Sequence, residues 1–190
     1  MAAVFAADGN SVVITGRRPE PLQTTAAQLG VKVRAVVCDG TDPAQVEALR
    51  VQLPESVDVL VHCADGNTDV DRHVAGRAVI NIGSIAADQG AGSYGAAKAG
   101  VASWNIDLAA ELGPRGVTAN VVAPGYTADT EFFRDKLTDQ RREALIAATS
   151  TGRASAPDDV AATVHFLASP AARQITGQVL AVNGGERTTR

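Results

Sequence analysis

The stretch AVINIGSIAADQGAGSYGAAKAGVASWNIDLAAEL, residues 78–112, decides our prediction of the fold. Its first five residues are an almost wholly apolar, β-branched run that ends before Gly83, which is typical of a buried strand. From Tyr94 to Leu112 the apolar residues follow helical spacing, and Gly113-Pro114 ends that segment. A buried strand followed by a long helix is the repeating unit of a parallel sheet.

The same alternation continues on both sides of this stretch. A helix over 42–53 has Asp42 as its expected N-cap and Pro43 in its first turn. Strands are predicted over 11–15, 31–38, 57–64, 78–82, 117–123 and 178–182, and helices over 19–29, 42–53, 94–112 and 158–168. We therefore predict an α/β fold with a Rossmann-like, doubly wound parallel sheet, formed by one domain that covers residues 1–190.

Composition excludes several classes of function. The chain has 190 residues, of which 45% are hydrophobic and 20% charged, as in ordinary globular domains. The net charge of −4 and the scattered basic residues argue against a nucleic-acid or membrane partner. No apolar run is long enough to span a bilayer, and residues 1–7 make a poor signal peptide, so we expect a cytoplasmic protein. Cys38 and Cys63 are expected to be free thiols, and the three histidines show no metal-ligand spacing.

Ser84, Tyr94 and Lys98 are the candidate catalytic residues. Ser84 follows the strand over 78–82, and Tyr94 and Lys98 stand one helical turn apart, so their side chains share a face. An ammonium beside a phenol stabilises the deprotonated phenol, which suits a general acid or base that acts on an alcohol–carbonyl pair. Ser84 could hydrogen-bond the same substrate oxygen. Alternatively, Tyr94 and Lys98 are ordinary surface residues of a helix.

The sequence around these residues resembles that of the short-chain dehydrogenase/reductase family, and in particular that of its 3-oxoacyl-carrier-protein-reductase-like members. INIGSIAADQGAGSYGAAKAG is similar to the active-site segment of the family. The other resembling segments, which stand in the family's order, are VVITGRRPE, VVCDGTD, TANVVAPGYTADTEF and SPAARQITGQVLAVNGG.

The resemblance implies oxidation or reduction of a carbonyl–alcohol pair with a nicotinamide cofactor. Tyr94 would be the acid/base, Lys98 would hold the nicotinamide ribose, and Ser84 would position the substrate oxygen. Further cofactor-binding residues implied by the resemblance are Asp39, Gly40, Ala64, Pro124, Gly125 and Thr127. A homo-oligomer, either a dimer or a tetramer, is also implied. The charged segment 129–142 carries Phe132 and Phe133, and is either a substrate lid or a solvated helix.

The turn after the first strand indicates which cofactor is preferred. It reads Thr15-Gly16-Arg17-Arg18, and no acidic residue lies between Ser11 and Arg18. An acid at this turn binds the ribose of NAD, whereas an arginine accommodates the 2′-phosphate of NADP. We therefore predict NADP(H) in preference to NAD(H), with Arg17 as the first candidate ligand and Arg18 as the second.

Three departures from the family pattern are visible. No Gly-rich turn for the pyrophosphate precedes Ser11. Asp65 stands where the family has glycine, and only nineteen residues separate Ala64 from Ser84, where the family has a long helix. The sequence therefore comes either from a truncated family member or from a longer chain of which segments are missing here, and the second explanation is favoured because the segment after Ile80 is intact.

Two functions from different classes stay open at this point. The first is an NADP(H)-dependent oxidoreductase that interconverts a small-molecule carbonyl compound and a secondary alcohol. The second is a non-catalytic Rossmann-like relic that binds or interacts without turnover. The sequence does not choose the substrate, because the same three residues serve many carbonyl compounds.

Overall fold

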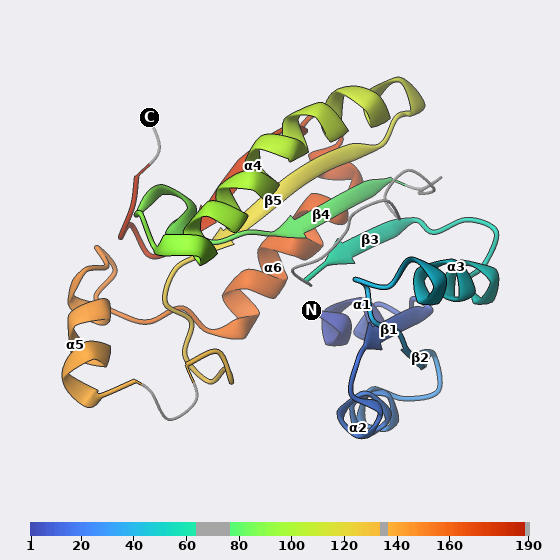
Figure 1. Cartoon of the computed structure of the whole chain (residues 1–190), viewed down its shortest axis with the longest axis horizontal. Helices are drawn as coiled ribbons and strands as arrows, with labels where there is room; N and C mark the ends of the chain where they lie inside the picture. The colour runs from blue at the N-terminus through green and yellow to red at the C-terminus, as the bar shows by residue number, and fades with distance from the viewer. Residues whose placement is uncertain (64–76, 134–136, 189–190) are drawn as a thin grey trace.

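The computed structural model describes residues 1–63, 77–133 and 137–188, and all pairing among its strands is parallel. A two-stranded sheet has the order β1-β2, and a four-stranded sheet has the order β3-β4-β5-β6 (Figure 1). The strands are β1 (Val12–Gly16), β2 (Val33–Val37), β3 (Val59–His62), β4 (Ala78–Ile82), β5 (Thr118–Pro124) and β6 (Val179–Val182). The predicted α/β class with parallel strands is confirmed.

Helices alternate with these strands along the chain. The α-helices are α1 (Ala2–Ala7), α2 (Pro19–Leu29), α3 (Pro43–Gln52), α4 (Gly92–Leu112), α5 (Asp139–Ala147) and α6 (Pro157–Ala168). Short 3₁₀ turns are η2 (Ile85–Asp88), η3 (Gly113–Arg115) and η5 (Pro170–Ala172). Asp42 caps α3 as predicted, because its side chain accepts hydrogen bonds from the backbone N–H groups of Ala44 and Gln45.

The four-stranded sheet is covered on both faces, as the alternation of side chains along a strand requires. On β4, Ala78 and Ile80 pack in one cluster with Val164 and Leu167 of α6. Val79, between them, packs in a second cluster with Leu108 and Leu112 of α4. Helices α4 and α6 therefore lie on opposite faces of the sheet (Figure 1). This arrangement confirms the doubly wound prediction for the larger sheet.

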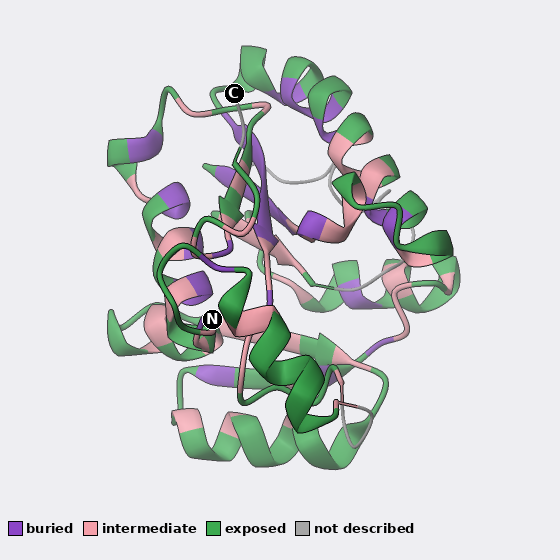
Figure 2. Ribbon diagram, turned by 90° about the vertical axis from the view of Figure 1, so that its left-hand side faces the viewer, coloured by how far each residue is buried: buried purple, intermediate pink, exposed green. Residues whose placement is uncertain are grey.

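The main core belongs to the four-stranded sheet. Figure 2 shows the buried residues concentrated on its strands and on the inner sides of its helices. By contrast, α2 contains no buried residue and α3 contains only Leu49. A small cluster of Val36, Cys38 and Leu49 holds β2 and α3 together. The smaller sheet is thus supported by fewer buried side chains than the larger one.

Helix α1 packs against both parts. Phe5 packs against the core cluster that contains α6, and its ring lies 5.5 Å from the ring of His165. His165 Nε2 also lies 2.6 Å from Asp8 Oδ2 at the end of α1. On the other side, α1 contacts β1 and α2. These contacts connect the smaller sheet to the larger one.

Some predicted boundaries differ from the structure. The predicted strand over 31–38 is shorter here, because residues such as Val31, which is fully exposed, lie outside the pairing of β2 with β1. The strand predicted from residue 57 begins at Val59. Helix α4 begins two residues before Tyr94, and α5 was not predicted as a separate helix. The predicted single sheet is divided: in the part of the chain described, β1 pairs only with β2, and β3 only with β4.

Two buried asparagines fasten β5 to its surroundings. Asn120 Nδ2 donates to the carbonyl of Ile175 at 2.7 Å, and its Oδ1 accepts from the Gln178 N–H at 3.1 Å. Asn105 of α4 donates to the carbonyl of Ala119 at 3.2 Å. Both asparagine side chains are completely buried. Asn120 thereby ties the centre of β5 to the chain that enters β6.

Among the described helices, none is long and apolar enough to cross a bilayer.

Candidate active site

The candidate catalytic residues lie where β4 ends. Ser84 stands directly before η2, and η2 packs against the first turns of α4, which carry Tyr94 and Lys98 (Figure 1). The carboxyl ends of parallel strands share one edge of their sheet, so Pro124 at the end of β5 belongs to this edge too. The residues that the sequence singled out therefore come from neighbouring strand ends.

Lys98 is buried and points to the end of β4. Its side chain is only 6% exposed, and Nζ donates to the carbonyl of Ile82 at 3.0 Å. The same nitrogen lies 5.7 Å from the centre of the Tyr94 ring. The predicted shared face of Tyr94 and Lys98 is thus present. A buried ammonium so close to a phenol can stabilise negative charge that develops on the phenol oxygen.

The hydroxyl of Ser84 is oriented by the backbone of a neighbouring residue, Ala86. Its Oγ accepts a hydrogen bond from the N–H of Ala86 at 3.1 Å, which caps η2. Since this bond uses an oxygen lone pair, the hydroxyl hydrogen stays available to donate. A donor fixed in this way suits a carbonyl oxygen that gains negative charge during reduction.

Close packing explains two glycines beside these residues. A Cβ at Gly95 would lie 2.6 Å from the backbone oxygen of Ala86, so any larger residue would push η2 away from α4. At Gly83 a Cβ would lie 2.6 Å from Cγ1 of Val121. Real Cβ atoms do not come so near to other atoms. Gly95 thus allows η2 to pack against the start of α4, and Gly83 allows the end of β4 to pack against β5.

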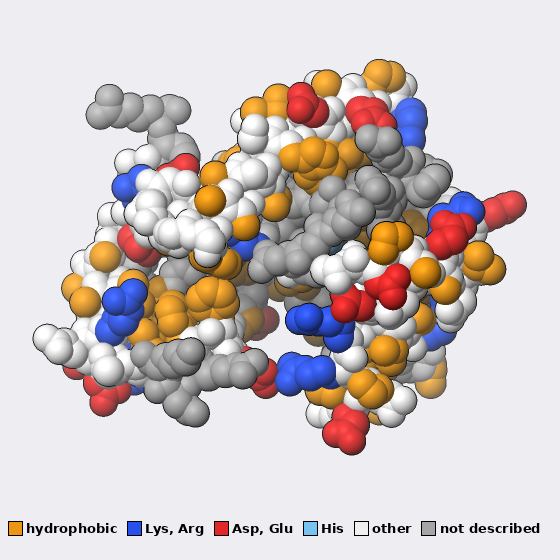
Figure 3. Space-filling view, in the orientation of Figure 1, with side chains coloured by type: hydrophobic (Ala, Val, Ile, Leu, Met, Phe, Trp, Pro, Cys, Tyr) orange, Lys and Arg blue, Asp and Glu red, His pale blue; other side chains and the backbone are white. Residues whose placement is uncertain are grey.

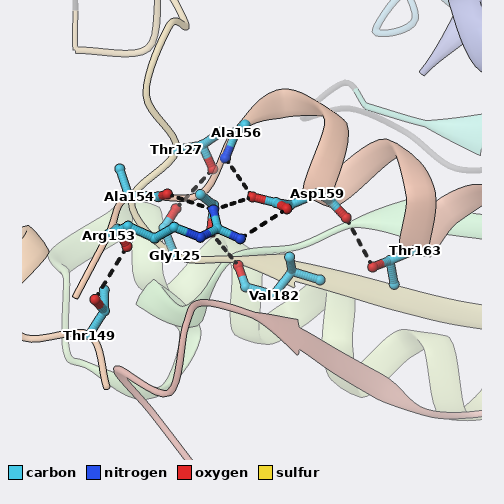
Figure 4. Close-up of polar contacts among 10 residues, drawn as sticks. Gly125, Thr127, Thr149, Arg153, Ala154, Ala156, Asp159, Thr163 and Val182 are labelled. Atoms are coloured by element: carbon cyan, nitrogen blue, oxygen red, sulfur yellow. Dashed lines mark hydrogen bonds and ion pairs between the residues drawn. The ribbon is translucent and has the colours of Figure 1, made fainter. Parts of the chain in front are cut away.

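The Pro-Gly loop after β5 is fastened to the segment before α6. Thr127 forms a parallel bridge with Ser155, whose N–H donates to the carbonyl of Tyr126 at 3.0 Å. Thr127 Oγ1 donates to the carbonyl of Gly125 at 3.3 Å (Figure 4). At Gly125 a Cβ would lie 2.9 Å from the Cβ of Asn183, which explains the glycine. Pro124, Gly125 and Thr127 thus form one braced loop beside the site.

An ion pair supports this loop from the N-terminus of α6 (Figure 4). The two oxygens of Asp159 accept from Arg153 at 2.8 and 3.2 Å, and one of them also accepts from the Ala156 N–H. The hydrogen bonds from Arg153 and then from Ala156 lower the pKa of Asp159 from 3.8 to about 2. Asp159 thereby caps the N-terminus of α6.

The lowered pKa of Asp159 predicts how stability depends on pH. A carboxyl whose pKa is lower in the folded state stabilises that state above its unfolded pKa, near 3.8, and loses this contribution as pH falls towards about 2. An Asp159→Asn variant should therefore unfold at lower urea concentration than the wild type at pH 7, with the gap closing between about pH 4 and pH 2. A gap that is constant with pH would contradict the assignment.

The candidate cofactor residues lie at the ends of β1 and β2. Arg17 and Arg18 are exposed directly after β1, and Arg18 forms an ion pair of 3.5 Å with Glu131. Asp39 lies after β2, and one of its oxygens accepts from the N–H and the hydroxyl of Thr41. These bonds, together with the nearby charge of Arg17, lower the pKa of Asp39. Gly40 is half-buried in the same turn.

The candidate cofactor residues after β1 and β2 belong to the smaller sheet, whereas the candidate catalytic residues belong to the larger one, and a hollow lies between these two parts. Figure 3 shows the hollow between the part that contains β1 and β2 and the part that contains the four-stranded sheet, with basic side chains on its rim. The ion pair between Arg18 and Glu131 spans from the turn after β1 to the segment after the Pro-Gly loop. Ala64 and Asp65, which the sequence also singled out, lie outside the described residues.

One charged residue near the Pro-Gly loop was not noticed from the sequence. Glu186 follows the closing glycines of the chain, and its Oε2 would lie 3.1 Å from a Cβ at Gly125. Its Oε1 accepts from Gln89 at 3.4 Å, whereas the buried Oε2 has no hydrogen-bond partner among the residues that the structure describes. No signal in the local sequence indicates this position, because Glu186 reaches the loop only through the path of β6.

The two cysteines of the chain, Cys38 and Cys63, are free thiols, as expected. Over residues 1–63, 77–133 and 137–188, no group of three or more His, Cys, Asp or Glu side chains could hold a metal ion.

Comparison with known proteins matches this architecture. The family described as "Enoyl-(Acyl carrier protein) reductase" matches residues 69–186. The chain is 32% identical to the 3-oxoacyl-[acyl-carrier-protein] reductase FabG of Escherichia coli (strain K12) over 224 residues, which cover 97% of this chain and 90% of the relative. It is 31% identical to the short-chain reductase protein NovJ of Streptomyces niveus over 226 residues, which cover 95% of this chain and 86% of NovJ.

A solved structure extends the likeness to three dimensions. The crystal structure of a putative betaketoacyl-ACP reductase superposes with a TM-score of 0.80 at 31% identity, and the match covers 97% of this chain and 90% of that one. The alignments with FabG and NovJ are longer than the 190 residues of this chain, so both relatives carry additional residues inside the matched region.

The parallel sheets, the alternating helices and the matches to reductases define a Rossmann-like α/β oxidoreductase. The family match and the relatives identify the group more closely: the chain belongs to the short-chain dehydrogenase/reductase family. It is therefore an enzyme of the class that acts on carbonyl–alcohol pairs, and the reductases of this family use nicotinamide cofactors.

Proposed function

We propose that this protein is an NADP(H)-dependent reductase that converts a small-molecule ketone to a secondary alcohol, with Tyr94 as the general acid. The observation that carries the proposal is the burial of the Lys98 ammonium against the Tyr94 ring at the end of β4. The carbonyl of Ile82 accepts a hydrogen bond from this ammonium and holds it at the end of β4. The cation is thereby fixed beside the phenol that has to give up a proton.

The residues of the chain divide the proton chemistry among them. Ser84 donates its hydroxyl hydrogen to the carbonyl oxygen and so positions that oxygen. The bond from the Ala86 N–H occupies one of the two lone pairs of Oγ and leaves the hydrogen for donation. Tyr94 then gives its phenol proton to the same oxygen. Lys98, held by the carbonyl of Ile82, stabilises the phenolate that results. In the reverse direction the same phenolate removes the proton of an alcohol.

The donor set at the strand ends fits a nicotinamide dinucleotide with a 2′-phosphate. When bound, such a cofactor supplies the hydride for the carbonyl carbon. Arg17 is exposed at the end of β1 and would bind the phosphate, while Lys98 would hold the ribose next to the nicotinamide. Asp39 and Gly40 would flank the adenine. Pro124, Gly125 and Thr127, in the loop braced by Ser155, would border the nicotinamide ring.

One contact supports Arg17 rather than Arg18 as the principal phosphate ligand. Arg18 is directed towards Glu131, with which it forms an ion pair. One of the two carboxylate oxygens of Asp39, Oδ1, is held by Thr41. An exposed guanidinium at this turn therefore favours a phosphate over a bare ribose.

Replacement of Arg17 by aspartate tests the cofactor preference. A charge-assisted hydrogen bond to phosphate contributes roughly 1.5–3 kcal/mol, which corresponds to about a tenfold to hundredfold change in affinity. Arg17→Asp should weaken NADPH binding by about that factor and leave NADH binding equal or stronger. The dissociation constants can be measured by the fluorescence of the bound reduced nicotinamide.

Arg173→Asp is the matched control, because Arg173 precedes β6 and so lies at the opposite edge of the sheet. It makes the same change of net charge and should leave both constants unaltered. If Arg17→Asp and Arg173→Asp weakened NADPH binding equally, the effect would be one of overall charge and the assignment of Arg17 would fail.

We further propose that residues 1–190 act as one domain in a cytoplasmic homo-oligomer, a dimer or tetramer. This proposal follows from the resemblance to the family. The exposed side chains of Ile106 on α4 and Val179 on β6, which are 61% and 40% exposed, are apolar surface that an interface could cover. Light scattering after size-exclusion chromatography measures the mass of the assembly, and a monomer at micromolar concentration would contradict it.

A further inference from the structure

Glu186 is an acid at the candidate site that the proposed proton chemistry does not use. It lies in the turn after β6, and its Oε2 would be 3.1 Å from a Cβ at Gly125, so this oxygen rests against the Pro-Gly loop. Oε2 is buried and accepts no hydrogen bond from any residue that the structure describes. The ion pairs found among the described residues also involve other acids.

The turn that carries Glu186 is held firmly at the end of β6. Asn183, which is 5% exposed, accepts from the Gly185 N–H and donates to the carbonyl of Arg187, each at 2.9 Å. The N–H of Glu186 itself donates to the carbonyl of Asn183 at 3.1 Å. The backbone on both sides of Glu186 is therefore fixed, and the carboxylate is kept beside the Pro-Gly loop.

The contacts of the carboxylate do not account for its position. Oε1 accepts one long hydrogen bond of 3.4 Å from the exposed side chain of Gln89, after η2. A carboxylate that only braced the turn would have both oxygens bonded, because a buried charge without a partner is unfavourable. The negative charge at Oε2 is thus available to a positively charged group on the other side of the Pro-Gly loop.

We propose that Glu186 makes the cofactor site prefer the oxidised nicotinamide over the reduced one. This inference rests on the proposed function, in which Pro124, Gly125 and Thr127 border the nicotinamide ring. That ring is neutral in NADPH and carries a positive charge in NADP⁺. A carboxylate against the loop attracts only the charged ring, and burial away from water strengthens the attraction. Glu186 therefore tightens the binding of NADP⁺ and leaves that of NADPH nearly unchanged.

The charge of Lys98 gives a reason for an acid at this place. Its ammonium is 6% exposed at the end of β4, on the same edge of the sheet as the Pro-Gly loop. Like charges at short range repel each other, so a buried cation at this edge disfavours a second cation beside it. Glu186 supplies the opposite charge from the turn after β6 and offsets this repulsion.

Glu186→Gln tests the inference, because it removes the charge with little change of shape. The dissociation constant of NADP⁺ is measured by calorimetric titration and that of NADPH by fluorescence. The ratio of the NADP⁺ constant to the NADPH constant should rise by about tenfold in the variant, through weaker binding of NADP⁺. A ratio equal to that of the wild type overturns the inference.

Three controls separate the charge from its surroundings. Glu111→Gln makes the same change of charge near the end of α4 that is remote from Tyr94, and Gln89→Leu removes the hydrogen bond to Glu186 but keeps its carboxylate. Both variants should keep the wild-type ratio. The ligand 2′-phospho-ADP-ribose, which lacks the nicotinamide ring, should bind wild type and Glu186→Gln equally. A rise in either control variant as large as that in Glu186→Gln overturns the inference, as does an equal loss of affinity for 2′-phospho-ADP-ribose.

Binding measurements keep this inference distinguishable from the proposed function. If both cofactor forms bind and the ratio is the same in wild type and Glu186→Gln, the role of Glu186 fails while the proposed reductase stands. A ratio that depends on Glu186 in a protein that reduces no ketone would support this inference and contradict the proposed reductase. If the wild type bound neither NADP⁺ nor NADPH, both proposals would be overturned.

Discussion

Replacement of Tyr94 by phenylalanine is expected to lower kcat by about 100-fold to 10,000-fold, the usual contribution of a general acid. Phenylalanine keeps the ring, so the packing against Phe132 and the position of Lys98 near the ring should persist. The variant loses only the hydroxyl that supplies the proton. Ketone reduction should therefore fail while NADPH binding is retained.

The measurement is the rate of ketone-dependent NADPH oxidation, with the NADPH dissociation constant measured alongside it. Tyr126→Phe is the matched control, because Tyr126 is the other tyrosine of the chain and its ring packs on that of Phe133. That variant should keep kcat within a few-fold of the wild type. If Tyr94→Phe retained a similar rate, another group would have to donate the proton and the assignment would be wrong.

Replacement of Asn120 by alanine is expected to cause the largest loss of stability. The Asn120 side chain is completely buried and satisfies both the carbonyl of Ile175 and the N–H of Gln178. Alanine would leave those two backbone groups without partners in the interior. An unsatisfied buried group costs about 1–3 kcal/mol, so we expect the free energy of unfolding to fall by roughly 2–4 kcal/mol.

Urea unfolding followed by circular dichroism measures this loss. Asn10→Ala is the control, because the Asn10 side chain also donates to a backbone carbonyl, that of Phe5, but is exposed. Water can replace that bond, so the control should lose less than about 0.5 kcal/mol. Similar losses in the two variants would mean that Asn120 does not anchor β5 to the chain entering β6.

Periodicity was sufficient to predict the individual elements of this fold. The strand over 78–82 and the helix over 19–29 were predicted to the residue, because β-branched runs and helix-stopping glycines are local signals. The division into two sheets was not predictable in this way. Which strand edges pair depends on how the tertiary fold brings all the strands together. The segments of β1 and β3 are both apolar, so the sequence predicts one sheet for them, whereas the structure places them in two sheets.

The candidate site was predictable where its residues are close in sequence. Tyr94 and Lys98 are one helical turn apart, so helix geometry alone placed them together. The contact of Phe132 with Tyr94 and the position of Glu186 beside Gly125 join segments that are far apart along the chain. Such contacts depend on the path of the loops after β5 and β6, for which residue spacing carries no signal.

The central claim is that this chain transfers a hydride from a nicotinamide to a ketone beside Tyr94, and labelled cofactor tests it most directly. Wild-type protein would be incubated with NADPH deuterated at C4 on either face and with the β-keto ester ethyl acetoacetate, and the product analysed by mass spectrometry. The account predicts a secondary alcohol that carries one deuterium on the carbinol carbon from one of the two labelled forms, and none with Tyr94→Phe. Absence of labelled alcohol from the wild type, or equal labelling by Tyr94→Phe, would contradict it.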